Sequence, residues 1–383
     1  MATPRSARRS GAAVALLALA GLLLPSSANA ADNGPPVDRV PVPRQIDEQV
    51  DFILSEQLDS GAILSTGTKI SPYFANIAAL GLLAADTRAA RTATLEWMQW
   101  YLGHLNDAAT NVPPNSVYDY IYDPATGTET PTGDFDSVDS YASTALNVAY
   151  HAYSSHDRRL QRFVEENIET YEAIAALLIT GAPTGVLVET GPDAGLTVAK
   201  PSYPIAFTMD NAEVYSGLVD LAALETLLGR ETQAAEYSAW ADATKDAMIE
   251  KLWNVTNDNW DWAYANPSNT DVFYAQGTAQ LWPIIFGVVA PTDPQAISGW
   301  SQFVGSFPDW HQGGTPDSYP WVSIARAAQL MGEPADARSF LDGVRARYAP
   351  TWTLPTSCGA AVCGEWYDAE AGWFLMASAA ARR

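Results

Sequence analysis

Carboxylates and aromatic side chains recur together in short segments that precede the most apolar stretches of the sequence. Two of these segments hold acids three positions apart, Asp136 with Asp139 and Asp210 with Glu213, and a third holds Asp317 before a Pro-Trp pair. Such a pair can cap a helix, so each alone has a structural interpretation. Paired carboxylates also cleave glycosidic bonds by acid and base catalysis. We therefore take these five residues as candidate catalytic groups.

The local surroundings separate candidate acids from candidate bases. The dipole and free N–H groups of a helix N-terminus keep a carboxylate ionised, which suits Asp136, Asp210 and Asp317 to a base or to stabilising a cationic transition state. A general acid needs a raised pKa, which apolar or acidic neighbours provide. Asp139 and Glu213, the second acids of the two pairs, meet this need, and so does Glu365, which precedes Trp366 and Tyr367.

Aromatic side chains of the same segments and of the intervening loops complete a candidate carbohydrate site. A flat apolar ring can stack on the C–H face of a sugar while polar edges stay hydrated. Alternating aromatics, such as Tyr118, Tyr120 and Tyr122, are equally consistent with the core of a β-hairpin. The candidate substrate-binding residues are Tyr73, Asn76, Tyr141, Trp262, Trp310, Tyr319, Trp321 and Trp366.

Stretches that are almost free of charge alternate along the chain with amphipathic ones. A helix that is apolar all round must be buried on every side, whereas an amphipathic helix can cover it. The apolar helices are expected over 71–85, 140–153, 214–228, 276–289, 319–331 and 371–381. The covering helices are expected over 46–58, 87–107, 157–179, 231–252, 294–304 and 333–348.

Six buried helices alternating with six covering ones predict an all-α fold, an (α/α)6 toroid of six helical hairpins with short β-hairpins in its loops. We expect one catalytic-type domain over residues 45–383. The inner helices of such a toroid start on one face, so the segments before them would gather in a common cleft. Like charges gathered in one cleft are costly unless they have a purpose, which strengthens the catalytic interpretation of the acids.

The first residues have the pattern of a secretory signal peptide over 1–30: arginines, a short apolar run, and the small-residue cleavage site Ala28-Asn29-Ala30. We expect an extended, proline-rich lead-in over 31–44 and a secreted, extracellular protein. In an oxidising compartment Cys358 and Cys363 should form a disulfide.

Charge and composition narrow the class of partner. The chain carries 44 acidic and 21 basic residues, a formal net charge of −23. This charge repels nucleic-acid phosphates and anionic lipid heads, so we expect neither nucleic acid nor membrane as a partner. The four histidines lack the short spacings of a zinc site, and we expect no metal and no cofactor. We predict a monomer whose partner is a polysaccharide or oligosaccharide substrate.

In their order along most of the chain, these motifs resemble the (α/α)6 glycoside hydrolases, distantly those of family 8, which act on β-linked glucans, xylans and chitosan. Ser65-Thr66-Gly67 stands where that family has Ser-Glu-Gly. Asp134-Phe-Asp136-Ser-Val-Asp139 is similar to its T-D-x-D-x-D segment, with one extra residue. Asp317-Ser-Tyr-Pro-Trp321 matches its aspartate before Pro-Trp, and the resemblance implies that Asp317 is the base.

The chain departs from that family at Thr66, because a threonine cannot replace the glutamate that protonates the leaving oxygen. Our leading hypothesis is a secreted glycoside hydrolase for a neutral or amino-sugar polysaccharide, with the acid elsewhere. A polysaccharide lyase, using groups such as Tyr73, Asn76, Tyr319 or His311, is an alternative, as is a carbohydrate-binding protein without catalysis. The aspartates around Asp136 could also bind Ca²⁺.

Overall fold

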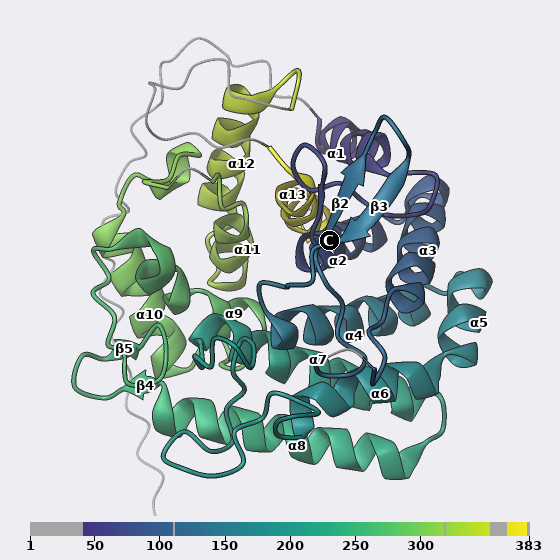
Figure 1. Ribbon diagram of the computed structural model, residues 1–383. Helices are drawn as coiled ribbons and strands as arrows, with labels where there is room; N and C mark the ends of the chain where they lie inside the picture. The colour runs from purple at the N-terminus through teal and green to yellow at the C-terminus, as the bar shows by residue number, and fades with distance from the viewer. Residues whose placement is uncertain (1–40, 110–111, 318, 353–365, 381–383) are drawn as a thin grey trace, which may run out of the picture. The chain divides into compact units, whose positions relative to one another are not determined.

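The computed structural model describes residues 41–380 apart from 110–111, 318 and 353–365. All described elements belong to one compact unit that begins at residue 40. Six helices form its inner layer, and each contacts the next along the chain. The last contacts the first, so the ring is closed (Figure 1). The inner helices are α2 (Pro72–Ala85), α4 (Val138–Ser154), α7 (Thr208–Leu227), α9 (Trp282–Ile285), α11 (Ser323–Leu330) and α13 (Asp368–Ala380).

The outer helices cover this ring, as their amphipathic patterns predict. The second outer stretch shows the principle: α3 buries Trp97, Met98 and Trp100 inward, and Thr87 caps its start by accepting the Ala90 N–H at 3.1 Å. The expected all-α toroid of six hairpins is thereby confirmed. The outer helices are α1 (Val42–Glu56), α3 (Arg88–Gly103), α5 (Arg158–Glu166) with α6 (Ile168–Ile179), α8 (Glu231–Lys251), α10 (Pro294–Ser306) and α12 (Pro334–Tyr348).

Two predicted helices are broken. The outer stretch expected over 157–179 divides at Asn167 into α5 and α6. The inner stretch expected over 276–289 is a π turn, Phe273–Gly277, a 3-10 turn, Thr278–Gln280, and the single α-turn of α9. Pro283 lacks a backbone N–H and therefore cannot continue a helix that begins before it, which explains why only a short α-turn forms here.

Helices α1 and α7 begin four or more residues earlier than expected. The first, α1, starts at Val42, inside the predicted lead-in, with Pro43 in its first turn, where a missing N–H costs nothing. The third inner helix, α7, starts at Thr208 and not near 214. Its N-cap is Phe207, so Asp210 and Glu213 lie inside the helix, one turn apart on the same face, and the cap interpretation of Asp210 is wrong.

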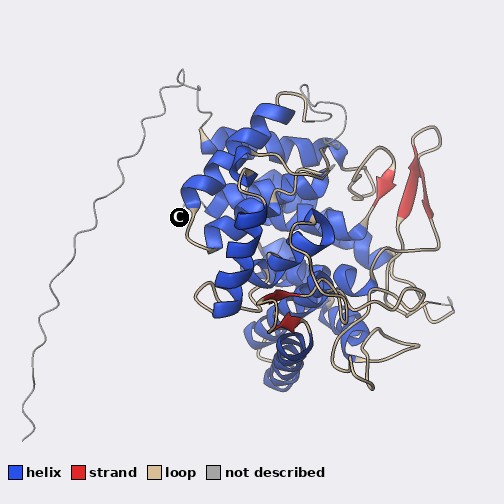
Figure 2. Ribbon diagram, turned by 90° about the vertical axis from the view of Figure 1, so that its left-hand side faces the viewer, coloured by secondary structure: helices blue, strands red, loops and turns tan. Residues whose placement is uncertain are grey.

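Short antiparallel strands form in the loops, as expected. One sheet has the order β1 (Lys69–Ile70), β2 (Tyr120–Asp123) and β3 (Thr128–Pro131). Its register pairs Ile70 with Tyr120 and Tyr122 with Glu129, and Figure 2 shows it at one end of the helices. A smaller hairpin pairs β4 (Trp253–Asn254) with β5 (Asn259–Trp260).

Glycines allow the first and last inner helices to approach closely. A Cβ at Gly81 of α2 would collide with the backbone of Gly372 in α13, and a Cβ at Gly372 would collide with the carbonyl group of Ile77. Only residues without a Cβ permit this contact, which closes the ring. Among the described helices none is both long and apolar enough to span a membrane.

Candidate active site

A cavity of about 380 Å³ opens where the inner helices start. Its lining includes residues of α2, α4, α7, α9, α11 and α13 and of the loops before them. Five carboxyl groups line it, from four different parts of the ring. They are Asp136, Asp210, Glu213, Asp317 and Glu370.

Glu213 is a buried carboxyl group in the wall of the cavity. Its Oε1 accepts hydrogen bonds from the Tyr73 hydroxyl at 2.6 Å and from the Trp282 indole Nε1–H at 2.8 Å. Its other oxygen, Oε2, is buried as well. Burial raises the pKa of Glu213 to about 7, although hydrogen bonds from Ser140, Tyr73 and Trp282 oppose the rise. The group can therefore carry a proton near neutral pH, as a general acid must.

Glu370 is the second buried glutamate of the cavity. Its oxygens accept the backbone N–H groups of Trp321 at 3.0 Å and Val322 at 2.7 Å, and Oε1 also accepts the Tyr367 hydroxyl at 3.2 Å. Burial raises its pKa to about 7, while these donors favour the ionised form. A carboxylate held in this way is oriented to accept a proton from water.

These two glutamates come from opposite sides of the ring. The ring runs α2, α4, α7, α9, α11, α13 and back to α2, so two helices separate α7 from α13 in either direction (Figure 1). Glu213 lies on α7 and Glu370 on α13, and both line the same cavity. The arrangement places a potential acid and a potential base on facing walls.

Asp210 does not have the ionised character that its position suggested. Burial, followed by the charges of Asp139 and Glu213, raises its pKa well above the usual value, although Ser137 Oγ donates to Oδ2 at 3.2 Å. Burial and like charges therefore outweigh the helix N-terminus. The prediction that Asp210 favours the base role does not fit this environment.

Asp139 lies behind the cavity wall and is not among the lining residues. It is fully buried, and its oxygens accept hydrogen bonds from Ser137 Oγ at 2.5 Å and Thr197 Oγ1 at 2.7 Å. Burial raises its pKa, as predicted, but the group cannot reach a substrate. It supports the α4 N-terminus, where Ser137 is the N-cap.

Among the acids of the lining, Asp136 is exposed and Asp317 is half-buried. Asp317 Oδ2 accepts the indole Nε1–H of Trp321 at 2.7 Å. Trp321 has a φ of +53°, a left-handed conformation that a bulky side chain rarely adopts. Since Glu370 accepts its N–H and Asp317 its indole N–H, the two carboxyl groups hold Trp321 in place from both ends.

Five of the eight predicted substrate-binding residues line the cavity: Tyr73, Tyr141, Trp262, Tyr319 and Trp321. Burial, followed by the charge of Glu213, raises the pKa of Tyr73 well above its usual value. A raised pKa keeps the hydroxyl group protonated, and only the deprotonated form could act as the base of a lyase, so this environment does not favour that role.

The other three lie in the core. Asn76 donates to the Tyr141 carbonyl oxygen at 3.2 Å and accepts the Trp97 indole N–H at 3.0 Å. Trp310 is buried against Trp300, with ring centroids 5.4 Å apart. Trp366 is buried and donates to Gln49 at 3.1 Å. These placements do not fit a role in substrate binding.

The structure adds residues that the sequence analysis missed. Glu370 stood in a segment already noted for its carboxylates and aromatics, one turn before Trp373, so the signal was present. Tyr367 and Trp373 belong to the same segment as Glu370. The other aromatic additions come from segments far apart in the sequence, so no spacing connects them: Tyr203, Phe207, Tyr274 and Trp282.

Several other predicted features lie elsewhere. Cys358, Cys363 and Glu365 fall outside the described residues. Thr66 forms a turn with Lys69 before β1 and is not among the lining residues. Asp134 pairs with Lys200 at 2.9 Å, away from Asp139, and the described residues contain no acidic cluster that could hold a metal ion.

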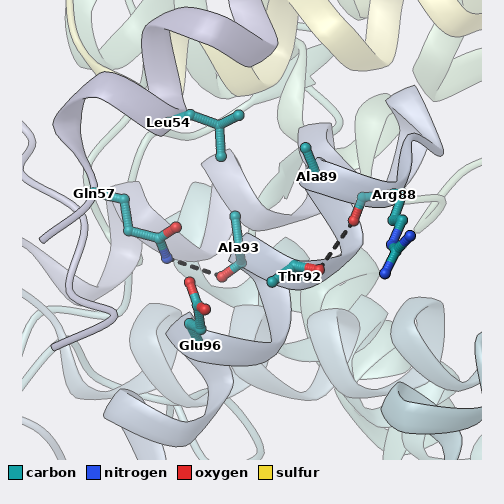
Figure 3. A pocket seen from close by; sticks show the side chains of 7 residues that line it. All are labelled: Leu54, Gln57, Arg88, Ala89, Thr92, Ala93 and Glu96. Atoms are coloured by element: carbon teal, nitrogen blue, oxygen red, sulfur yellow. Dashed lines mark hydrogen bonds between the residues drawn. The ribbon is translucent and has the colours of Figure 1, made fainter. Parts of the chain in front are cut away.

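A second hollow of about 520 Å³ lies between the outer helices α1 and α3 (Figure 3). Gln57 and Glu96 lie on its wall, but the Gln57 amide donates to the Ala93 carbonyl oxygen at 2.9 Å. Thr92 likewise donates to the Arg88 carbonyl oxygen at 3.1 Å. These polar groups bind within the protein, and we assign this hollow no function.

A closed ring of helical hairpins with facing carboxyl groups in a central cavity defines a glycoside hydrolase of the helical-toroid class. Residues 43–315 match the family of mannosylglycerate hydrolase MGH1-like glycoside hydrolase domains, and the chain belongs to this family. The match includes Asp136, Asp210 and Glu213 and ends before Asp317 and Glu370. The expectation that the protein is a glycosidase is confirmed by this family membership.

Solved structures show the same fold. A glycosidase in a glutamate-to-alanine variant bound to glucose is 13% identical, with a TM-score of 0.61 over 88% of this chain and 95% of that one. The GH63 mannosylglycerate hydrolase from Thermus thermophilus in complex with glucose is 13% identical, with a TM-score of 0.59 over 88% and 99%. A GH76 α-mannanase from Bacteroides thetaiotaomicron is 12% identical, with a TM-score of 0.57 over 90% and 97%. No curated protein sequence matches the chain.

Proposed function

We propose that this protein is a secreted glycoside hydrolase that cleaves a neutral or amino-sugar polysaccharide or oligosaccharide, with Glu213 as the general acid and Glu370 as the general base. One observation carries this proposal: two buried glutamates with pKa values raised to about 7 line facing walls of one cavity. The carboxylate-rich lining supports a substrate without negative charge. The signal-peptide pattern of residues 1–30 supports secretion.

In the proposed reaction Glu213 gives its proton to the glycosidic oxygen while the bond from that oxygen to the anomeric carbon breaks. A water molecule attacks the anomeric carbon and gives a proton to Glu370, so the products are two free sugars. If the carboxyl groups are about 6.5–9.5 Å apart the configuration inverts. At about 5–5.5 Å Glu370 would attack directly and the configuration would be retained.

The likeness to family 8 makes Asp317 the competing base. Asp317 borders the cavity on the same side as Glu370 and binds Trp321, which also binds Glu370. We favour Glu370 because three donors orient it and because it is the more deeply buried of the two. The two assignments differ in which substitution removes activity.

The test is a screen of the purified protein on glucans, xylan, chitosan, mannan and the corresponding disaccharides. Glu213→Gln and Glu370→Gln should each lower kcat by about 100-fold or more, the usual contribution of a general acid or base. Asp220→Asn is a matched control, because Asp220 is a half-buried acid with a raised pKa on α7 that does not line the cavity. Full activity in both glutamate variants, or a larger loss in Asp317→Asn, would contradict the assignment.

A further inference from the structure

The exposed aromatic side chains of this protein are concentrated at one place. Among the described residues the exposed aromatics are Tyr203, Tyr274 and Tyr319, with exposed fractions of 51%, 59% and 43%. All three line the candidate active site, although they come from different loops. Large apolar faces left in water at one site indicate a surface that a ligand covers.

Burial divides the cavity into a deep part and a mouth. Trp282, Trp373 and Glu370 are between 2% and 7% exposed, whereas the three tyrosines are about half exposed. The glutamates, which must flank the bond that breaks, belong to the deep part. When a glycoside binds with its scissile bond between the glutamates, its leaving group therefore lies at the mouth, against the exposed rings.

One wall of the mouth is a row of three rings held by a fixed backbone. The Tyr203 and Phe207 centroids are 6.1 Å apart, and those of Phe207 and Trp262 are 5.7 Å apart. Lys200 Nζ binds Asp134 and the Phe135 carbonyl oxygen, at 2.9 and 2.6 Å, which anchors the Tyr203 loop. We call these three rings, Tyr203, Phe207 and Trp262, the aromatic wall.

Other backbone and ring contacts fix the rest of the mouth. The Trp262 carbonyl oxygen accepts the Thr208 N–H at 3.0 Å, which ties the aromatic wall to the start of α7. Tyr274 packs on Trp321 with centroids 5.2 Å apart and planes 35° apart. Rings held in place before binding cost less entropy when a ligand stacks on them.

We propose that the leaving group is itself a sugar ring, which stacks on the aromatic wall, so that the enzyme prefers an oligosaccharide to a glycoside of a small acid such as glycerate. Flat rings match the C–H face of a pyranose, and the accessible carboxylates of Asp136 and Asp317 can accept hydrogen bonds from its hydroxyl groups. Glycerate has no ring to stack, and those carboxylates repel its charge. The proposal rests on the proposed glycoside hydrolase activity.

The test compares two substrates of the same sugar. A glycosyl fluoride occupies only the deep part of the cavity, whereas a disaccharide also reaches the mouth. The probes are the α- and β-fluorides of glucose and mannose, the matching disaccharides, and mannosylglycerate. We expect Tyr203→Ala and Trp262→Ala each to lower the ratio of kcat/KM for disaccharide to that for fluoride by about 3- to 10-fold.

Matched variants separate stacking from damage to the fold. Tyr203→Phe keeps the ring and should keep the ratio, and Ile297→Ala removes an equally exposed apolar group from α10, outside the cavity. An unchanged ratio in both alanine variants, or wild-type preference for mannosylglycerate over every disaccharide, would overturn the proposal. If the wild-type protein hydrolyses no fluoride and no disaccharide, the proposed function itself fails.

Discussion

Replacing Glu213 by glutamine is the most informative perturbation of the site. Glutamine preserves the size of the side chain and an oxygen that can accept the Tyr73 and Trp282 hydrogen bonds, but it cannot supply a proton. A general acid typically contributes about 10²- to 10⁴-fold to the rate. We expect a loss of this size on disaccharides and a smaller loss on glycosyl fluorides, since fluoride leaves without a proton.

The dependence on pH gives a sharper test. The productive form needs Glu213 protonated and Glu370 ionised, and both pKa values are raised to about 7. If the groups titrate independently, about one quarter of the molecules are productive at pH 7, and about one hundredth at pH 5 or 9. The rate should therefore follow a narrow bell with its maximum near pH 7.

In Glu213→Gln the proposed acid no longer titrates, and of the two proposed catalytic glutamates Glu370 remains. The rate should then rise through pH 7 and remain level at higher pH, so the alkaline fall of the wild-type protein disappears. The assay is kcat/KM on a disaccharide between pH 5 and 9. Survival of the alkaline fall in this variant would refute Glu213 as the acid.

Asp210→Asn is the control on the same face of α7. Burial and the neighbouring charges raise the pKa of Asp210 and so favour its neutral form, which a neutral amide should largely reproduce. We expect a loss of at most about tenfold and an unchanged pH profile. A loss as large as that of Glu213→Gln, with the alkaline fall removed, would transfer the acid role to Asp210.

Four further outcomes follow from named contacts. Glu370→Gln should remove the acidic fall of the profile, because the base no longer protonates. The Tyr73 hydrogen bond lowers the pKa of Glu213 by favouring its ionised form. Tyr73→Phe removes this bond, so the pKa of Glu213 and the alkaline fall of the rate should move to higher pH. Gly372→Ala should lower the melting temperature, with a loss of about 1–3 kcal/mol from the collision with α2. Burial raises the pKa of Asp220 from 3.8 to about 7, so this group binds its proton more tightly in the folded state. It therefore stabilises the protein at low pH, and this stabilisation is lost as the pH rises through 7. Asp220→Asn should remove up to about 4 kcal/mol of the difference in unfolding free energy between pH 4 and pH 8, measured by denaturant titration.

The helical ring could be predicted because burial leaves a direct mark on composition. An inner helix such as α2 carries no charge, whereas an outer helix such as α3 carries charges on one side. The prediction was weakest at the fourth inner position, where 276–289 has the composition of a buried helix but Pro283 prevents a long one. Composition reports whether a segment is buried, and backbone geometry decides whether it is helical.

The site was harder to predict, because composition does not give the direction of a side chain. Asp136 and Asp139 lie close together in the sequence, yet one lines the cavity and the other is sealed behind it. Trp366 precedes α13 as Trp321 precedes α11, but the first packs in the core. Tyr203 and Trp262 meet through Phe207 only once the loops have folded, so no spacing connects them.

The close passage of α2 and α13 sets an order of events during synthesis. Glu213 lies near the middle of the chain, and Glu370 lies on the final helix, which must pack against α2 before the cavity has its second wall. Contacts between segments far apart in the sequence form slowly, since the loop between them is long. A ribosome-bound chain that still lacks Asp368–Ala380 therefore holds the proposed acid without the proposed base. Under the proposed mechanism, hydrolysis can begin only after α13 has been made and has packed against α2.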